Sequence, residues 1–124
     1  MGYLGTELIL TIPYNAENAK IVFEYKYSSD WNAGSEEKCV VQLVSEDGDA
    51  SNNYAPVKMS QVELPYNAAA VDTWTTAEVD LSGAYANNWD AKDGADLSSI
   101  IVTRINPLTG TGTLYIRGLM VLSK

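Results

Sequence analysis

The chain has 124 residues, a length that suits one domain with a substantial hydrophobic core. Hydrophobic residues make up 46% of the sequence and charged residues 19%, which excludes a disordered chain, and no apolar run approaches the roughly 20 residues that cross a bilayer. The net charge of −8, from 8 basic and 16 acidic residues, repels phosphate backbones and argues against nucleic acid as a partner.

The first half of the chain alternates apolar and polar residues with the period of two that is typical of β-strands. We expect strands over residues 7–13, 20–27 and 38–46, and a turn at the Asp-Gly-Asp sequence of residues 47–49. The second of these is the clearest, because its apolar residues all fall on one face. Those residues are Ile21, Phe23, Tyr25 and Tyr27.

Cys39 is the only cysteine, and the chain has no histidine. An internal disulfide is therefore excluded, and so are the commonest general base and the commonest zinc ligand. Cys39 opens an alternating strand and has no histidine to activate its thiol, so we expect a small buried side chain rather than a nucleophile.

The second half of the chain continues the same pattern. We expect strands over residues 60–64, 75–81, 99–105 and 113–122, with a further short strand near residues 54–58. In residues 75–81 the alternation turns Ala77, Val79 and Leu81 inward. Gly118 interrupts the last strand and predicts a β-bulge there.

Helical signals are weak. Residues 68–71 are too short for a helix and lack caps, and residues 85–92 could hold one helical turn at most. Seven to nine short antiparallel strands in a chain of this size predict an all-β, two-layer β-sandwich of the jelly-roll type. We expect residues 1–124 to form one such domain, excised from a larger protein.

One short motif occurs twice. Ile-Pro-Tyr-Asn-Ala at residues 12–16 returns as Leu-Pro-Tyr-Asn-Ala at residues 64–68. In each copy proline stops a strand and asparagine tolerates the turn that follows. We favour a structural role, in which Tyr14 and Tyr66 plug the ends of the sandwich, over a ligand role.

Four segments carry a resemblance to a known family. Trp74 opens a strand that ends in Asp-Leu, residues 96–100 read Asp-Leu-Ser-Ser-Ile, residues 112–119 form a closing strand, and residues 21–27 match an early one. This order resembles the galactose-binding-like jelly rolls, which include many carbohydrate-binding modules of bacterial surface or secreted proteins. The resemblance implies a fold and a strand order, with Trp74 in core or edge packing.

The chain departs from that family at Arg117. The family commonly has aspartate there, and its carboxylate often belongs to a structural calcium site. Arginine would repel the cation, so we expect neither a metal site nor a cofactor. Structural calcium is the alternative left open, either at Asp90, Asp93 and Asp96 or at residues 47–49. It is not favoured, because the spacing of the first group does not match an EF-hand and a solvated acidic loop explains these residues as well.

The predicted ligand-binding residues are aromatic side chains in polar loops. A sugar ring stacks on a flat aromatic face, and neighbouring amides or carboxylates bond its hydroxyl groups. Trp31, Trp89 and Tyr54 lie in loops of this kind, and Asn88 and Asp90 flank the second of them. The alternative for each tryptophan is that it folds back over an end of the sandwich.

These observations predict a non-catalytic carbohydrate-binding module that recognises a polysaccharide or oligosaccharide by aromatic stacking. We expect it outside the cytoplasm (extracellular, periplasmic or at a bacterial cell surface), without membrane insertion, and as a monomer or part of a multidomain chain. The main alternative is a structural or protein-interaction domain of a cell-surface protein with no small-molecule ligand. Catalysis by a pair of acidic residues is a third reading, but no catalytic motif selects such a pair, so we predict no enzyme.

Overall fold

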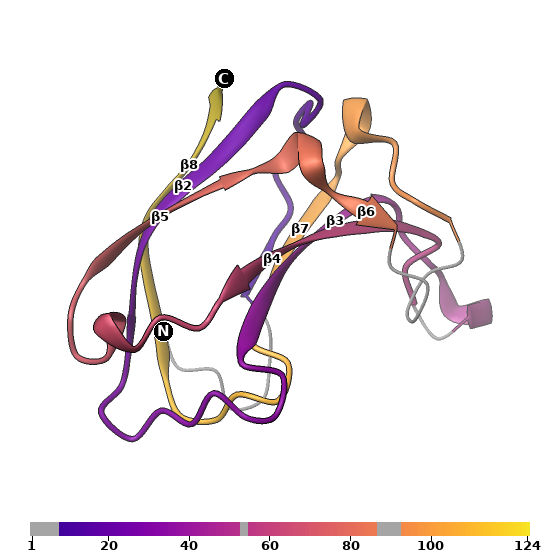
Figure 1. Cartoon of the computed structure of the whole chain (residues 1–124). Coiled ribbons are helices and arrows are strands. Elements are labelled where there is room, and N and C mark those ends of the chain that lie inside the picture. Colours follow the sequence, from indigo (N-terminus) through magenta and orange to yellow (C-terminus); the bar gives the residue numbers. More distant parts are fainter. Residues whose placement is uncertain (1–7, 53–54, 87–92) are drawn as a thin grey trace.

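A computed structural model describes residues 8–52, 55–86 and 93–124, which form two antiparallel β-sheets (Figure 1). This part of the chain contains eight strands and no α-helix, as the sequence pattern predicts. The strands are β1 (Leu8–Leu10), β2 (Ala19–Tyr27), β3 (Lys38–Glu46), β4 (Lys58–Pro65), β5 (Thr75–Asp80), β6 (Tyr85–Ala86), β7 (Val102–Asn106) and β8 (Leu114–Ser123).

The two sheets differ in size. The larger has five strands in the order β1-β7-β3-β4-β6, and the smaller has three in the order β5-β2-β8. In Figure 1 the smaller sheet lies on the left and the larger on the right. Every strand pair is antiparallel, which confirms the all-β two-layer sandwich.

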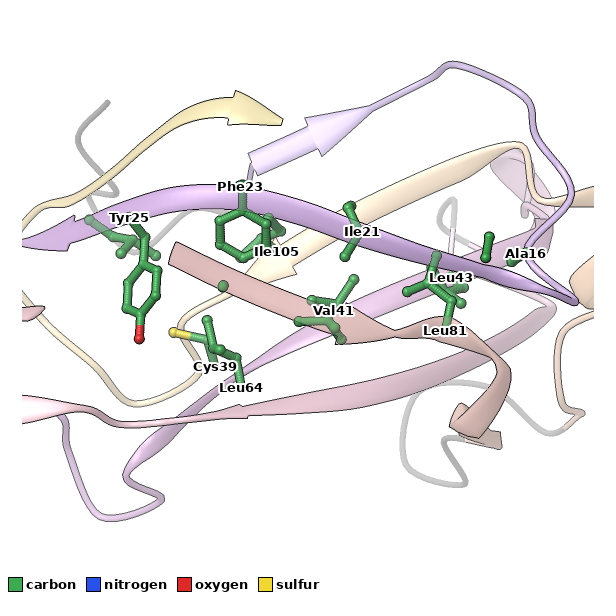
Figure 2. Packing of buried hydrophobic residues seen from close by; sticks show 14 of the residues in the cluster. Ala16, Ile21, Phe23, Tyr25, Cys39, Val41, Leu43, Leu64, Leu81 and Ile105 are labelled. Carbon is green, nitrogen blue, oxygen red and sulfur yellow. The ribbon is translucent and has the colours of Figure 1, made fainter. Parts of the chain in front are cut away.

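The hydrophobic core lies between the sheets. Residues 21, 23, 25 and 27 of β2 are at most 3% exposed, which confirms the buried face that their alternation predicts. Figure 2 shows Ile21 and Phe23 of β2 on one side of the core and Val41 and Leu43 of β3 on the other. Each fully buried side chain of this size contributes about 1.5 to 3 kcal/mol to folding.

Cys39 belongs to this core, as its place in the strand predicts. Its side chain is 2% exposed and packs with the buried cluster (Figure 2). Burial raises the pKa of the thiol to about 12, because an apolar site disfavours the thiolate. The thiol is therefore protonated at neutral pH and unreactive.

Short 3₁₀ turns account for the departures of β5 and β7 from their expected boundaries. Asp80 and Asp96 each accept hydrogen bonds from a serine two residues later, and each starts a 3₁₀ turn, at Leu81–Gly83 and Leu97–Ser99. Asn67 caps a third 3₁₀ turn at Ala68–Ala70, where we expected no capped helical structure. These caps end β5 one residue early and delay β7 to Val102.

The structure of Tyr85 and Ala86 differs in type from the one predicted. We expected at most a helical turn over residues 85–92, but Tyr85–Ala86 pairs with β4 as strand β6. Two residues are too few to show a periodicity, so the pairing partner rather than the local pattern decides this conformation.

The predicted bulge at Gly118 is confirmed. Val22 pairs with Met120 and Glu24 pairs with Arg117, so two residues of β8 stand opposite one residue of β2. Gly118 has φ +63°, a left-handed conformation that residues with a Cβ seldom adopt.

The two copies of the repeated motif lie at opposite ends of the sandwich. The Tyr66 N–H donates to the carbonyl oxygen of Glu37, directly before β3, and its ring lies 5.3 Å from that of Tyr27. The Tyr14 hydroxyl lies 2.6 Å from the hydroxyl of Thr103, a partner of the later half of β3. Both tyrosines are partly buried against the core, in agreement with the structural role we favour.

Candidate functional site

Most of the binding residues predicted from the sequence lie outside the described residues. These are Tyr54, Asn88, Trp89 and Asp90. Their roles stay predictions, and Trp31 is the one member of the set whose surroundings the structure shows.

Trp31 is built into the end of the sandwich. Its ring stacks on Tyr27, with the centroids 4.9 Å apart and the planes at 27°. On Gly110 a Cβ would lie 2.5 Å from the indole Cζ2, so the ring also presses against this backbone. These contacts agree with the alternative that Trp31 folds back over the sandwich, and they leave less of the indole for a ligand.

Trp74 lies at the edge of the smaller sheet, directly before β5, and outside the buried core cluster. Arg117 Cζ lies 3.8 Å from its ring centroid, and Lys26 Nζ lies 4.9 Å from it. Lys26 Nζ also lies 5.1 Å from the Tyr115 ring. The indole therefore packs beneath two cations on the outer face of the smaller sheet.

A different set of side chains meets on the outer face of the larger sheet. Val41 of β3 points into the core, so its neighbour Gln42 points outward. Gln42 pairs with Gln61 on one side and with Arg104 on the other, and these pair in turn with Tyr85 and Ile9. Antiparallel partners share a face, so these five side chains form one row across the sheet, which we call the cross-sheet row.

Exposure within the cross-sheet row falls from its ends to its centre. Tyr85 is 47% exposed at one end and Ile9 is 51% exposed at the other. Gln61 and Arg104 are half-buried, and Gln42 in the middle is only 3% exposed. The row thus combines an exposed aromatic ring with polar groups that become more buried toward the centre.

Hydrogen bonds orient the Tyr85 ring. Its hydroxyl accepts from Gln61 Nε2 at 3.3 Å and donates to Glu63 Oε1 at 3.0 Å. Lys38 Nζ donates to the same carboxylate oxygen at 2.7 Å. The hydrogen bond from Lys38, followed by that from Tyr85, holds the pKa of Glu63 below its ordinary value. The carboxylate is therefore ionised at neutral pH, and the ring is tethered by its hydroxyl while almost half of the residue faces solvent.

The guanidinium of Arg104, beside the centre of the row, is incompletely satisfied. Arg104 Nη2 lies 3.8 Å from Asp47 Oδ1, too far for a hydrogen bond, and the buried Nε has no hydrogen-bond partner. Buried polar groups in native proteins are almost always paired, so the Nε of Arg104 calls for an explanation.

An apolar cluster borders the row. Val44 of β3 lies against Met59 of β4 and Val102 of β7, its partners across the outer face. All three are at most 8% exposed. The row is therefore fixed on a rigid part of the sheet, which favours a preorganised contact surface.

Within residues 8–52, 55–86 and 93–124 no group of three or more acidic or cysteine side chains could hold a metal ion. Asp96, which the sequence suggested for calcium, instead accepts hydrogen bonds from Ser98. In the same residues no helix is long and apolar enough to span a membrane.

The sequence analysis named no member of the cross-sheet row. One signal was Gln42, a polar residue within the apolar run of β3. Another was that Gln61 and Arg104 occupy outward-facing positions in the alternation of their own strands. Their meeting depends on strand register, which the alternation within one strand does not specify.

Comparison with known proteins finds no matching family model, no matching curated protein and no matching solved structure.

Proposed function

We propose that this protein is a non-catalytic carbohydrate-binding module of the galactose-binding-like kind, and that the glycan lies along the cross-sheet row. The observation that carries the proposal is the row itself. It places an exposed, tethered tyrosine beside two amides and a guanidinium on one rigid sheet face.

Each part of the row suits one requirement of sugar recognition. The exposed face of Tyr85 offers an apolar platform for the C–H side of a pyranose ring. The amides of Gln42 and Gln61 carry both donors and acceptors, and Arg104 adds donors, so hydroxyl groups of either orientation find partners. Glu63, held by Lys38 and Tyr85, keeps the platform in place.

The length of the row suits an oligosaccharide rather than one sugar. Neighbouring strands lie about 4.8 Å apart, so the four intervals from β6 to β1 span roughly 19 Å. The exposed Tyr85 at one end and the exposed Ile9 at the other can contact both ends of such an oligosaccharide. Affinity would be modest, because ordering a flexible chain costs entropy.

Titration calorimetry against plant, host and microbial polysaccharides tests this function. We expect heat of binding for at least one glycan, with amide NMR shifts concentrated in β3, β4, β6 and β7. No binding at millimolar sugar would remove the proposal. Shifts confined to β2, β5 and β8 would move the site to the other sheet.

A second function, contact with another protein, has its own supporting observation. Tyr115, Met120 and Leu122 share the outer face of β8 and are 36%, 53% and 39% exposed. Tyrosine, methionine and the neighbouring arginine are enriched at protein interfaces. If this function is the true one, the glycan panel gives no heat, and Met120→Asp rather than Tyr85→Ala abolishes the contact.

A further inference from the structure

Arg104 has the most buried side chain of the basic residues in the described ion pairs, yet it lies farther from its carboxylate than Lys38 and Arg117 lie from theirs. Lys38 lies 2.7 Å from Glu63, and Arg117 Nε lies 3.1 Å from Glu24. Arg104 comes no closer than 3.8 Å to Asp47, although its side chain is only 16% exposed against 51% for Arg117. The more buried arginine therefore has the weaker partner, the reverse of the usual arrangement.

The unsatisfied groups of Arg104 are all donors. A guanidinium carries five N–H donors and no acceptor, and the buried Nε of Arg104 has no partner. A ligand that completes this site must therefore supply acceptor oxygens. A hydroxyl group supplies one, whereas a carboxylate supplies two in a plane and matches the fork of the guanidinium.

Gln42 adds a second polar side chain beside Arg104. The two residues are cross-strand partners, so their side chains stand next to each other on the outer face. Gln42 is only 3% exposed. Its side-chain NH₂ group can supply a further donor next to the guanidinium.

We infer that the glycan carries a carboxylate, as a uronic acid does, and that Arg104 and Gln42 bind this group at the centre of the cross-sheet row. The inference rests on the proposed function and names its ligand class. The side chain of Arg104 is 16% exposed and its Nε is buried, so binding requires the guanidinium to rotate until Nε and one Nη face the carboxylate. The sugar ring that bears the carboxylate would then lie beside Gln61, on the way to Tyr85.

Of the acidic groups behind the net charge of −8, Asp47 opposes this contact most directly, because its Oδ1 lies 3.8 Å from Arg104 Nη2, and the donors of Arg104 and Gln42 have to outweigh it. Charges more than about 8 Å apart are screened at physiological salt, so the distant carboxylates mainly slow the encounter. The contact itself depends on the local donors of Arg104 and Gln42. Preference for the acidic sugar should therefore reside in a slower dissociation rate.

Calorimetry on matched pairs of probes tests the inference. The probes are oligomers of galacturonic, mannuronic and glucuronic acid, each compared with the same oligomer after reduction of its carboxyl groups to alcohols. We expect one acidic oligomer to bind at least about tenfold more tightly than its neutral counterpart. Arg104→Gln should remove this preference and keep the weaker binding of the neutral form, whereas the control Arg117→Gln, on the opposite sheet, should keep both.

The outcomes separate this inference from the function on which it rests. Equal affinity for the acidic and neutral forms, or a preference that survives Arg104→Gln, overturns the carboxylate and leaves glycan binding intact. Binding of neutral glycans alone has the same meaning, and binding of no glycan removes both proposals. Should Arg104→Gln fail to fold, the Nε–H resonance of Arg104 in the unmodified protein decides, because it must shift on adding the acidic oligomer and stay in place with the neutral one.

Discussion

The outer faces of the two sheets are built in different ways. On the larger sheet the outward residues of the central strand, Val40, Gln42 and Val44, are at most 3% exposed. On the smaller sheet the outward residues of its central strand β2, which include Glu24 and Lys26, are all partly exposed. The outer residues along the middle of the larger sheet are thus buried, whereas those of the smaller sheet remain partly exposed to solvent.

This difference shows where each face obtains its order. The smaller sheet holds its outer residues through ion pairs and cation–π contacts, such as Arg117 with Glu24 and with Trp74. Such surface contacts contribute little and rearrange easily. The larger sheet holds its outer residues by burial, which fixes their positions more firmly. A recognition surface needs that fixity, which supports the proposal that a glycan binds to the larger sheet.

The largest difference between the faces should appear in stability. Met59 is 1% exposed on the larger sheet and Met120 is 53% exposed on the smaller. We expect Met59→Ala to lower the free energy of unfolding by about 2 to 5 kcal/mol, because it leaves a cavity beside Val44. Met120→Ala should change it by no more than about 0.5 kcal/mol. Urea unfolding measures both, and equal losses would show that the two faces are packed alike.

Substitution of one exposed tyrosine on each sheet tests which outer face binds the glycan. Tyr85 and Tyr115 are both partly exposed, at 47% and 36%, on opposite sheets. Tyr85→Ala removes the proposed platform and should weaken glycan binding by about tenfold or more, whereas Tyr115→Ala should leave the affinity unchanged. Calorimetry with the glycan that binds best provides the measurement. The reverse result would place the sugar on the smaller sheet, beside Trp74.

Substitution of one arginine on each sheet should change the free energy of unfolding by a smaller amount. Arg104→Met removes a buried N–H without a partner, so we expect the free energy of unfolding to stay constant or rise by about 1 kcal/mol. Arg117→Met breaks the pair with Glu24 and the contact with Trp74, and should lower it by less than about 1 kcal/mol. A clear loss of stability in Arg104→Met would mean that this side chain serves the fold rather than a ligand.

Local pattern predicted most of the scaffold. The bounds of β3 were predicted to the residue, and the bulge at Gly118 was predicted from one glycine. Both features depend on the chain near them, since alternation and backbone freedom are local properties. β6 was missed because its two residues, Tyr85 and Ala86, become a strand only by pairing with β4.

The candidate site was harder to predict for the same reason. The sequence analysis selected aromatic residues in loops, and Trp31, the member that can be followed, packs on Tyr27 and Gly110. Tyr85 and Arg104 are 19 residues apart in the sequence. They belong to the same row only because of the register between β6, β4, β3 and β7. Spacing along the chain carries no trace of that register.

The smallest effects concern one carboxylate on each face. Hydrogen bonds from Lys124 and then Ser82 hold the pKa of Asp80 at about 2, and those from Lys38 and then Tyr85 hold the pKa of Glu63 below its ordinary value. Because both pKa values are lowered by folding, each group stabilises the protein above its unfolded pKa, and this contribution is lost as the pH falls through its folded pKa.

Removing the hydrogen-bond donors of Asp80 and of Glu63 should change the pKa values of these two carboxylates to different extents. Lys124→Met should raise the pKa of Asp80 only in part, since Ser82 still donates through its backbone and side chain. Lys38→Met together with Tyr85→Phe removes both hydrogen bonds to Glu63 and should return its pKa to the ordinary range. NMR titration of the carboxyl carbons measures both shifts. If the pKa of Glu63 stays low in the double variant, another donor holds this carboxylate, and the tether that orients Tyr85 is not the one described.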